Sequence, residues 1–259
     1  MNRKKLSYAL KLFLAMVLIM FAAQSVLAGN SNPGIAPVKS SPGGNSYAEW
    51  GAMWAQWVLG IPFEQNPLFG NDVLVEQENC PIVFLSGTAL GSSTTSLTVK
   101  PNTRFYIPML NYLTATIWDL DYGAAVAEMR GLDPNDLTDG ELIQLAADNW
   151  LFEADITEIT VEIDGVPVEN PTQYGSVSEP FVVEDDALGF GLAEPGVLTA
   201  IASYAIILSP MQPGEHTIFV DSYIDPSNDP PGFPGYYDEY EFDVTFHVTV
   251  EPGYASACD

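Results

Sequence analysis

The chain has 259 residues and is strongly acidic, with 34 Asp and Glu against 8 Lys and Arg and a formal net charge of −26. Four of the eight basic residues, Arg3, Lys4, Lys5 and Lys11, precede or enter an apolar run at the N-terminus. This shortage of cations excludes a nucleic-acid-binding protein, which needs Lys and Arg to neutralise phosphates, and disfavours docking onto anionic lipid. A hydrophobic content of 47% supports a folded core.

Residues 1–28 predict a secretory signal peptide. A basic start is followed by an apolar run and by the small residues of Val26-Leu27-Ala28. An uncleaved anchor is the alternative, because the run approaches the roughly 18–20 residues that span a bilayer. The Val-x-Ala ending favours cleavage. We therefore expect an exported protein, periplasmic or extracellular, with no membrane contact after cleavage and an oligomeric state that the sequence does not indicate.

A flexible leader is expected over residues 29–45, which are rich in turn formers, and a single domain over 46–259. The domain opens with a predicted helix, where Ser46 and Glu49 form a capping box and Gly60 closes the last turn.

Trp50, Trp54 and Trp57 recur at helical spacing within this predicted helix and so share one face. Such a face could stack on sugar rings, but three large aromatics on one stripe more often anchor a helix to a core. We therefore expect the three tryptophan rings to pack in the core.

Most of the remaining chain predicts strands. Residues 157–163 alternate polar and apolar side chains before an Asp164-Gly165 turn, and 241–250 alternate in the same way. The continuous apolar run 198–208 indicates a strand buried on both faces, and further strands are expected at 82–85, 97–99, 104–108 and 216–221. The pattern predicts a mainly β fold, an antiparallel β-sandwich of jelly-roll or immunoglobulin-like type.

A small helical insertion is expected at about 119–155. Thr138 and Glu141 make a second capping box, and Leu142, Leu145 and Trp150 follow at helical spacing.

Four segments of the sequence form a recognisable pattern: the Trp motif of residues 50–57, Pro108-Met109-Leu110-Asn111, Ser209–Ile218 with its Pro-Gly-Glu-His-Thr-Ile sequence, and Phe242–Val250. In this pattern the chain resembles an uncharacterised family of exported bacterial proteins. The resemblance covers roughly residues 47–111 and 157–250, so that the insertion falls outside it. Because the family has no established activity, the resemblance implies no catalytic residue.

Cys80 and Cys258 are the two cysteines of the chain. In an oxidising compartment they could form one disulfide that ties down the C-terminus, or both could remain free thiols. Both alternatives stay open.

The long connection between the last two predicted strands, residues 225–240, is the candidate binding segment. Hairpin loops usually have 2–5 residues, and longer ones tend to be functional or disordered. Rings and a carboxylate side by side suit sugar recognition, and a loop folded back over the sheet is the alternative. The predicted ligand-binding residues are Phe233, Tyr236, Tyr237, Asp238 and Tyr240.

A calcium ion is the cofactor most compatible with so acidic a chain, since Ca²⁺ prefers oxygen ligands. Asp119 and Asp121 are the candidate ligands, although the segment lacks the Glu that would end an EF-hand loop. Because acidic clusters of this kind are usually turn and cap residues, we expect no cofactor, with calcium as the alternative. His216 and His247 are expected to face each other across a hairpin, where a metal role is less favoured than turn capping.

The sequence contains no GxSxG, HExxH or P-loop motif. We therefore predict an exported binding or structural protein with a glycan or other extracellular ligand, and leave enzymatic activity uncertain. The alternative is a secreted hydrolase that uses a pair of close carboxylates, which sequence alone cannot locate.

Overall fold

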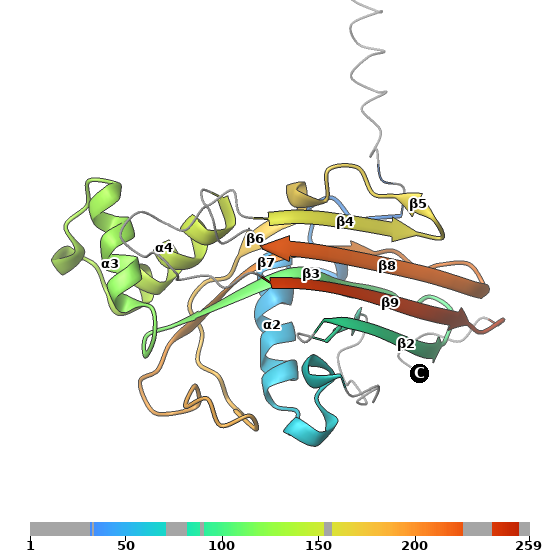
Figure 1. Ribbon diagram of the computed structural model, residues 1–259, viewed down its shortest axis with the longest axis horizontal. Coiled ribbons are helices and arrows are strands. Elements are labelled where there is room, and N and C mark those ends of the chain that lie inside the picture. Colours follow the sequence, from blue (N-terminus) through green and yellow to red (C-terminus); the bar gives the residue numbers. More distant parts are fainter. Residues whose placement is uncertain are drawn as a thin grey trace, which may run out of the picture. The chain divides into compact units, whose positions relative to one another are not determined.

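The computed structural model describes residues 32, 34–70, 82–88, 91–152, 157–224 and 240–253. The described residues from Gly34 onward form one compact unit, which is mainly β (Figure 1). The α-helices of the described residues are α2 (Tyr47–Leu59), α3 (Leu120–Met129) and α4 (Asp139–Phe152). The strands are β1 (Ile82–Phe84), β2 (Ser92–Val99), β3 (Arg104–Ala115), β4 (Thr157–Ile163), β5 (Val166–Pro167), β6 (Gly175–Val177), β7 (Thr199–Leu208), β8 (Gly214–Ile224) and β9 (Tyr240–Val250).

These strands form two sheets. Sheet A has the order β1-β3-β7-β6, and sheet B has the order β2-β9-β8-β4-β5. β1 runs parallel to β3 and β2 runs parallel to β9, whereas the other pairs are antiparallel. The predicted mainly β fold is confirmed, and most neighbouring strands are antiparallel as expected, but one parallel pair in each sheet makes both sheets mixed. β1 and β3 are separated in the chain by β2, which belongs to the other sheet, and residue periodicity carries no information about such a crossing.

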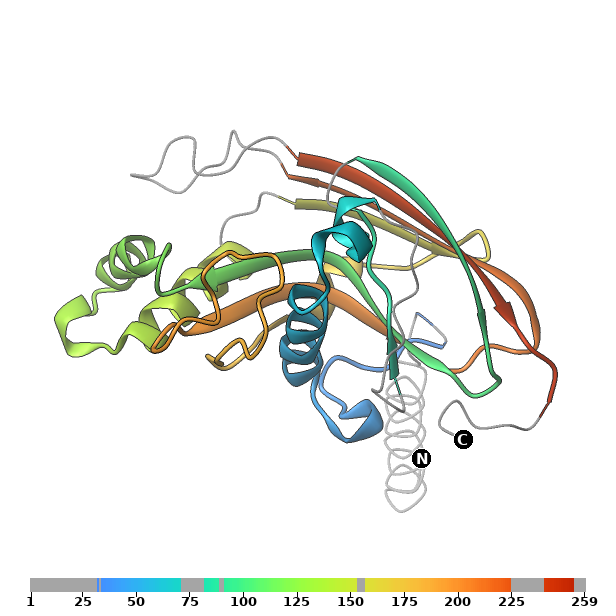
Figure 2. The ribbon, with the colours of Figure 1, turned by 90° about the horizontal axis from the view of Figure 1, so that it is seen from below.

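Sheet A is covered on both faces. Figure 2 shows α2 on one side of sheet A and sheet B on the other. α4 also packs on the side opposite α2, because the Thr114 hydroxyl of β3 donates to the Ile143 carbonyl of α4, 3.0 Å away. All ten residues of β7 are consequently buried, which confirms the strand predicted from the continuous apolar run.

The Trp-rich helix α2 anchors to the core. Its capping box is present: the Glu49 amide donates to Ser46 Oγ, and the Ser46 amide donates to Glu49 Oε2. Trp50 and Trp54 are only 2% and 5% exposed, and Trp57 is half-buried. The core interpretation is confirmed, and the three rings do not form an exposed platform for sugars.

The helices α3 and α4 lie within the predicted insertion. The Thr138 and Glu141 capping box is formed, with the Glu141 amide 3.3 Å from Thr138 Oγ1. The two helices approach closely at Gly123, where an added Cβ would lie 2.2 Å from the Leu142 carbonyl oxygen. No helix of the described residues is long and apolar enough to span a bilayer.

The second part of the predicted leader packs onto the domain. Ile35 is buried and bridges to Leu208, the last residue of β7. The Ala36 amide donates to the Ile207 carbonyl at 2.9 Å. Residues 34–36 are thus bound to the end of β7 rather than free, because the strand end offers them backbone partners and an apolar surface.

Candidate functional site

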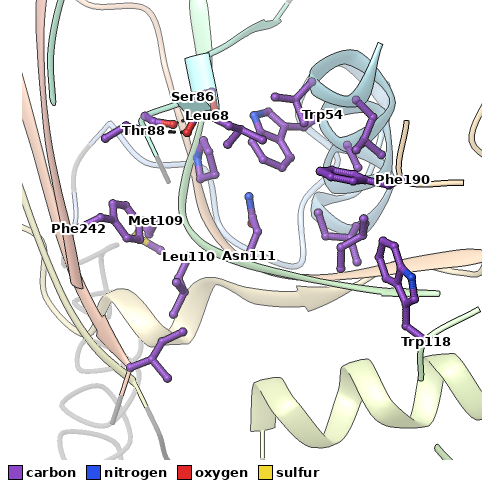
Figure 3. Close-up of a pocket in the computed structure, with 18 residues that line it drawn as sticks. Trp54, Leu68, Ser86, Thr88, Met109, Leu110, Asn111, Trp118, Phe190 and Phe242 are labelled. Atoms are coloured by element: carbon purple, nitrogen blue, oxygen red, sulfur yellow. Dashed lines mark hydrogen bonds between the residues drawn. The ribbon is translucent and has the colours of Figure 1, made fainter. Parts of the chain in front are cut away.

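A cavity of about 520 Å³ lies along the second half of β3 (Figure 3). Its walls come from α2, from the segments that follow α2 and β1, from β3 and β7, from the loop that precedes β7, and from the β8 and β9 ends. The lining residues are Trp54, Ala55, Val58, Leu59, Leu68, Ser86, Gly87, Thr88, Pro108, Met109, Leu110, Asn111, Leu113, Trp118, Phe190, Ile201, Ile224 and Phe242.

The cavity begins where β1 leaves β3. β1 pairs with Arg104–Tyr106 only, and the last contact is the Leu85 amide donating to the Tyr106 carbonyl at 3.0 Å. The chain then reaches sheet B at Gly87, where an added Cβ would lie 2.1 Å from a methyl group of Val244 on β9. Only glycine fits so close to β9, and the crossing leaves the rest of β3 as an edge.

The edge of β3 next to the cavity presents backbone hydrogen-bonding groups. Thr199, opposite Ala115, exchanges both its hydrogen bonds with Phe181, away from β3. Because the bonded and non-bonded pairs of an antiparallel ladder alternate, Asn111 and Leu113 also direct their N–H and C=O groups away from β7. Among the described strands, none pairs with this part of the edge.

Aromatic side chains form the walls and the mouth. The Trp54 indole N–H donates to the Leu85 carbonyl at 2.9 Å, which holds the ring against the cavity. Trp118 and Phe190 meet edge to face with ring centroids 6.3 Å apart, and they are 49% and 45% exposed. Two such rings in contact with solvent, beside an apolar cavity, are typical of a binding surface rather than of a core.

One amide is aimed into the cavity by a buried hydrogen-bond chain. Burial raises the pKa of the Tyr106 hydroxyl far above its usual range, against a smaller lowering by its bond to Ser203, so the hydroxyl stays protonated. Tyr106 Oη lies 2.8 Å from Ser203 Oγ, and Ser203 in turn donates to Asn111 Oδ1. With its oxygen occupied, Asn111 directs its NH₂ group into the cavity (Figure 3).

The described lining residues include no Asp, Glu, Lys, Arg or His. The pair of close carboxylates required by the hydrolase alternative is therefore not found among them. Such a surface suits an uncharged ligand with a large apolar area, oriented by a few polar groups such as Asn111.

The predicted glycan-binding residues Phe233, Tyr236, Tyr237 and Asp238 lie outside the described residues. Tyr240 begins β9 and pairs with Ile224, the last residue of β8. Ile224 and Phe242, which flank the predicted loop on its two sides, both line the cavity. Cys80 and Cys258 also lie outside the described residues, so the disulfide stays a prediction.

The candidate calcium ligands occupy different positions. Asp119 is buried, and its carboxylate accepts hydrogen bonds from the Ala115 amide at 2.8 Å and the Tyr112 hydroxyl at 3.2 Å. Asp121 is exposed in the first turn of α3, where the helix dipole stabilises a negatively charged carboxylate. Over the described part of the chain, no three His, Cys, Asp or Glu side chains gather as a metal site would require.

The predicted histidine pair is not formed. His216 lies opposite Val248, and His247 lies opposite Thr217. The register differs by one residue from the expected one, which places the two rings on opposite faces of sheet B. His216 instead holds a turn, with Nδ1 2.8 Å from Asp164 Oδ2 and Nε2 2.8 Å from the Gln212 carbonyl.

No protein-family model and no curated protein matches the chain. Two solved structures show a weak similarity to it. One is the cysteine protease inhibitor EhICP2 from Entamoeba histolytica, which is 14% identical and has a TM-score of 0.22, with 66% of this chain and 96% of that chain covered. The other is PbICP-C in complex with falcipain-2, at 10% identity and TM-score 0.22, covering 66% and 98%. Likeness this weak supports neither a fold type nor a function, so the site is interpreted from its own chemistry.

The sequence did not predict the cavity, although it contained one sign of it. Pro108 lies inside an otherwise regular strand, and proline is confined to edge strands or bulges because it has no N–H to donate. The ladder between β3 and β7 does shift register between Pro108 and Leu110. Trp118 and Phe190, at the mouth, come from loops whose meeting no local pattern indicates.

Proposed function

We propose that this protein is an exported binding protein that holds a largely apolar, uncharged ligand in the cavity along β3. The single observation that carries the proposal is a cavity of about 520 Å³ lined by apolar and aromatic side chains, with the Asn111 amide as its oriented donor. Cavities of roughly 300–1,000 Å³ with this composition are the usual form of small-molecule and cofactor sites.

Export is part of the proposal, and the predicted signal peptide at 1–28 supports it. The fold type belongs here as well: two packed sheets favour a β-sandwich, with a jelly-roll or immunoglobulin-like arrangement as the finer hypothesis. Expression with residues 1–28 in a bacterial host, followed by the mass of the exported chain, tests export. Cleavage after Ala28 is expected, and retention of the segment would contradict it.

Binding is tested with N-phenyl-1-naphthylamine, a neutral dye whose fluorescence rises in an apolar site. We expect saturable binding that Leu113→Trp weakens by about tenfold or more, because the larger ring occupies the cavity that Leu113 lines. Leu132→Trp is the matched control, since Leu132 is 45% exposed and lies outside the lining. No saturable binding, or equal loss in both variants, would contradict the proposal.

The glycan hypothesis competes with this one and is tested separately. Retention on a polysaccharide panel that is lost on deletion of residues 226–238 would support the glycan hypothesis. The described lining offers few hydrogen-bonding side chains for sugar hydroxyls, which is why an apolar ligand is preferred for the cavity.

A further inference from the structure

We propose that the ligand is an extended polypeptide segment of a partner protein, which pairs with the edge of β3 as an additional strand of sheet A and places apolar side chains in the cavity. This inference rests on the proposed function, since it names the ligand of the same site. It follows from the backbone groups at that edge, the length and faces of the cavity, and the charge around it.

The edge of β3 offers a strand the partners that it needs. Asn111 and Leu113 direct their N–H and C=O groups away from β7, at the side where the cavity lies. Two residues at alternate positions match the spacing at which a neighbouring strand exchanges hydrogen bonds. A small apolar molecule would leave these four groups without partners, whereas an extended peptide satisfies them, and strand addition to a sheet edge is an established mode of peptide recognition.

The lining follows the strand for a suitable length. It includes Pro108–Asn111 and Leu113, and Trp118 and Phe242 lie toward opposite ends in Figure 3. Six residues of extended chain span about 20 Å, so the segment of β3 that lines the cavity can pair with a peptide of about that length. β1 already shows that this edge accepts a strand, because it pairs with β3 immediately before the cavity.

Both faces of an added strand would meet apolar groups. Side chains on one face would meet α2, which contributes Trp54, Val58 and Leu59 to the lining. Side chains on the other face would meet Ile224 and Phe242 at the ends of β8 and β9. Because the side chains of a strand alternate between its two faces, a segment of consecutive apolar residues fits better than one that alternates with polar residues.

The acidic residues near the cavity indicate which side chains should flank the apolar part of the bound peptide. Asp121, which is exposed, lies three residues after the mouth residue Trp118, and Asp185 and Asp186 belong to the loop that carries Phe190. None of the described basic residues lines the cavity. The part of the segment inside the cavity is uncharged, and we expect Lys or Arg outside the cavity on either side of the apolar residues, because opposite charges speed association and disfavour other partners.

The experiment uses a synthetic peptide of consecutive Val, Ile and Phe residues with two lysines at each end, labelled for fluorescence anisotropy. The matched control has the same sequence with N-methyl groups at alternate residues, on the edge that would face β3. This control keeps the apolar side chains and the charge but removes the donors. We expect the peptide to bind and N-methylation to weaken it by about tenfold or more.

A protein variant tests the same hydrogen bonds from the other side. Leu113→Pro removes the outward N–H, and Leu113→Ala removes the side chain alone. We expect the Pro variant to bind the peptide several-fold more weakly than the Ala variant, and equal binding of the peptide by the two variants would contradict a hydrogen bond from this N–H. Urea unfolding of both variants establishes that they fold.

The outcomes separate the two proposals. Equal binding of the plain and N-methylated peptides would overturn strand pairing and leave the apolar site intact. Dye binding without binding of either peptide would likewise overturn this inference alone. Failure of both dye and peptide to bind would contradict the proposed function as well.

Discussion

The two halves of β3 differ in what lies beside them, although they belong to one strand. Along Arg104–Tyr106 the strand has β1 on one side and β7 on the other, and Phe105 and Tyr106 are fully buried. Along Pro108–Leu113 its only neighbour among the described strands is β7, and this half borders the cavity. The first half is a closed core, and the second half is an accessible edge with apolar walls.

An open strand edge beside an apolar cavity can therefore arise when one short neighbouring strand leaves the sheet early. β1 has three residues, and the crossing at Gly87 takes the chain to sheet B before it could cover Asn111 and Leu113. The two halves stay connected through Ser203, which joins Tyr106 in the closed half to Asn111 in the open half. Packing in one half therefore orients a donor in the other.

A substitution in the closed half should destabilise the protein most. Trp50→Ala removes a ring that is 2% exposed, packs on Phe84 with centroids 6.0 Å apart, and donates to the Pro42 carbonyl. We expect the free energy of unfolding to fall by about 3–5 kcal/mol, from lost burial and the cavity left behind. Urea denaturation measures it. Leu113→Ala in the open half is the comparison, with an expected loss below about 1 kcal/mol; equal losses would remove the distinction between the halves.

The crossing point is expected to be the next most sensitive position. Gly87→Ala brings a methyl group against Val244, which is buried on β9, and we expect a loss of about 1–3 kcal/mol from overpacking. Adding Val244→Ala relieves the clash, so the double variant should lose less than the sum of the two single losses. A double-mutant cycle by urea unfolding measures this, and strict additivity would show that the contact does not determine the crossing.

Breaking the link between the halves should affect both stability and binding. Ser203→Ala leaves the buried Tyr106 hydroxyl without its partner, and we expect a loss of about 1–2 kcal/mol in unfolding free energy. In Tyr106→Phe combined with Ser203→Ala the unpaired hydroxyl is absent, so this variant should recover part of the loss. Recovery of stability without recovery of ligand affinity would show that orientation of Asn111 is a separate contribution. No recovery of stability would contradict the hydrogen-bond chain.

The smallest effect is expected where His216 links the connection between β7 and β8 to the turn at Asp164. Burial lowers the pKa of His216, but the hydrogen bonds to Asp164 and Gln212 outweigh it and raise the pKa above the usual 6.5. Burial raises the pKa of Asp164, but the bonds from His216 and Thr217 outweigh it and lower the pKa below the usual 3.8. Both groups contribute their full stabilisation between pH 3.8 and pH 6.5, the usual pKa values of Asp and His. Stability is lost as pH falls through the lowered pKa of Asp164 or rises through the raised pKa of His216.

The pH dependence is tested by comparing the wild type with His216→Gln. The wild type should be more stable by no more than about 0.2–1 kcal/mol near pH 5, after allowance for solvent screening of the half-exposed Asp164, and the difference should shrink at pH 8. Melting temperatures of both proteins across this range measure it. A difference that grows toward alkaline pH would contradict the assigned pair.

Local patterns in the sequence predicted individual elements well. Ser46 and Glu49 identified the start of α2, and the apolar run before Ser209 identified β7 as a buried strand. Both predictions depend on neighbours within a few residues. The short strands β5 and β6 were missed, because two or three residues show no periodicity. The hairpin of β8 and β9 was correctly expected, but its register was wrong by one residue.

The candidate site could not be predicted in the same way. Its residues come from segments as distant as Trp54, Trp118, Phe190 and Phe242, each of which is an ordinary apolar residue in its own context. The long loop at 225–240 was predicted as the binding segment instead, because its length and composition can be read directly from the sequence. Ile224 and Phe242, which flank this loop, line the cavity, but their position does not test whether the loop binds a ligand.

Composition and periodicity along the chain were enough to predict the charge, the positions of the main helices and strands, and the burial of the Trp face. They did not predict the length of β3, which was expected to end at 108 and extends to Ala115. Which strands run parallel, where β1 leaves β3, and which apolar residues line a cavity became visible in the folded chain alone. These depend on contacts between segments tens of residues apart, and the crossing at Gly87 against Val244 shows how one such contact leaves the edge of β3 accessible.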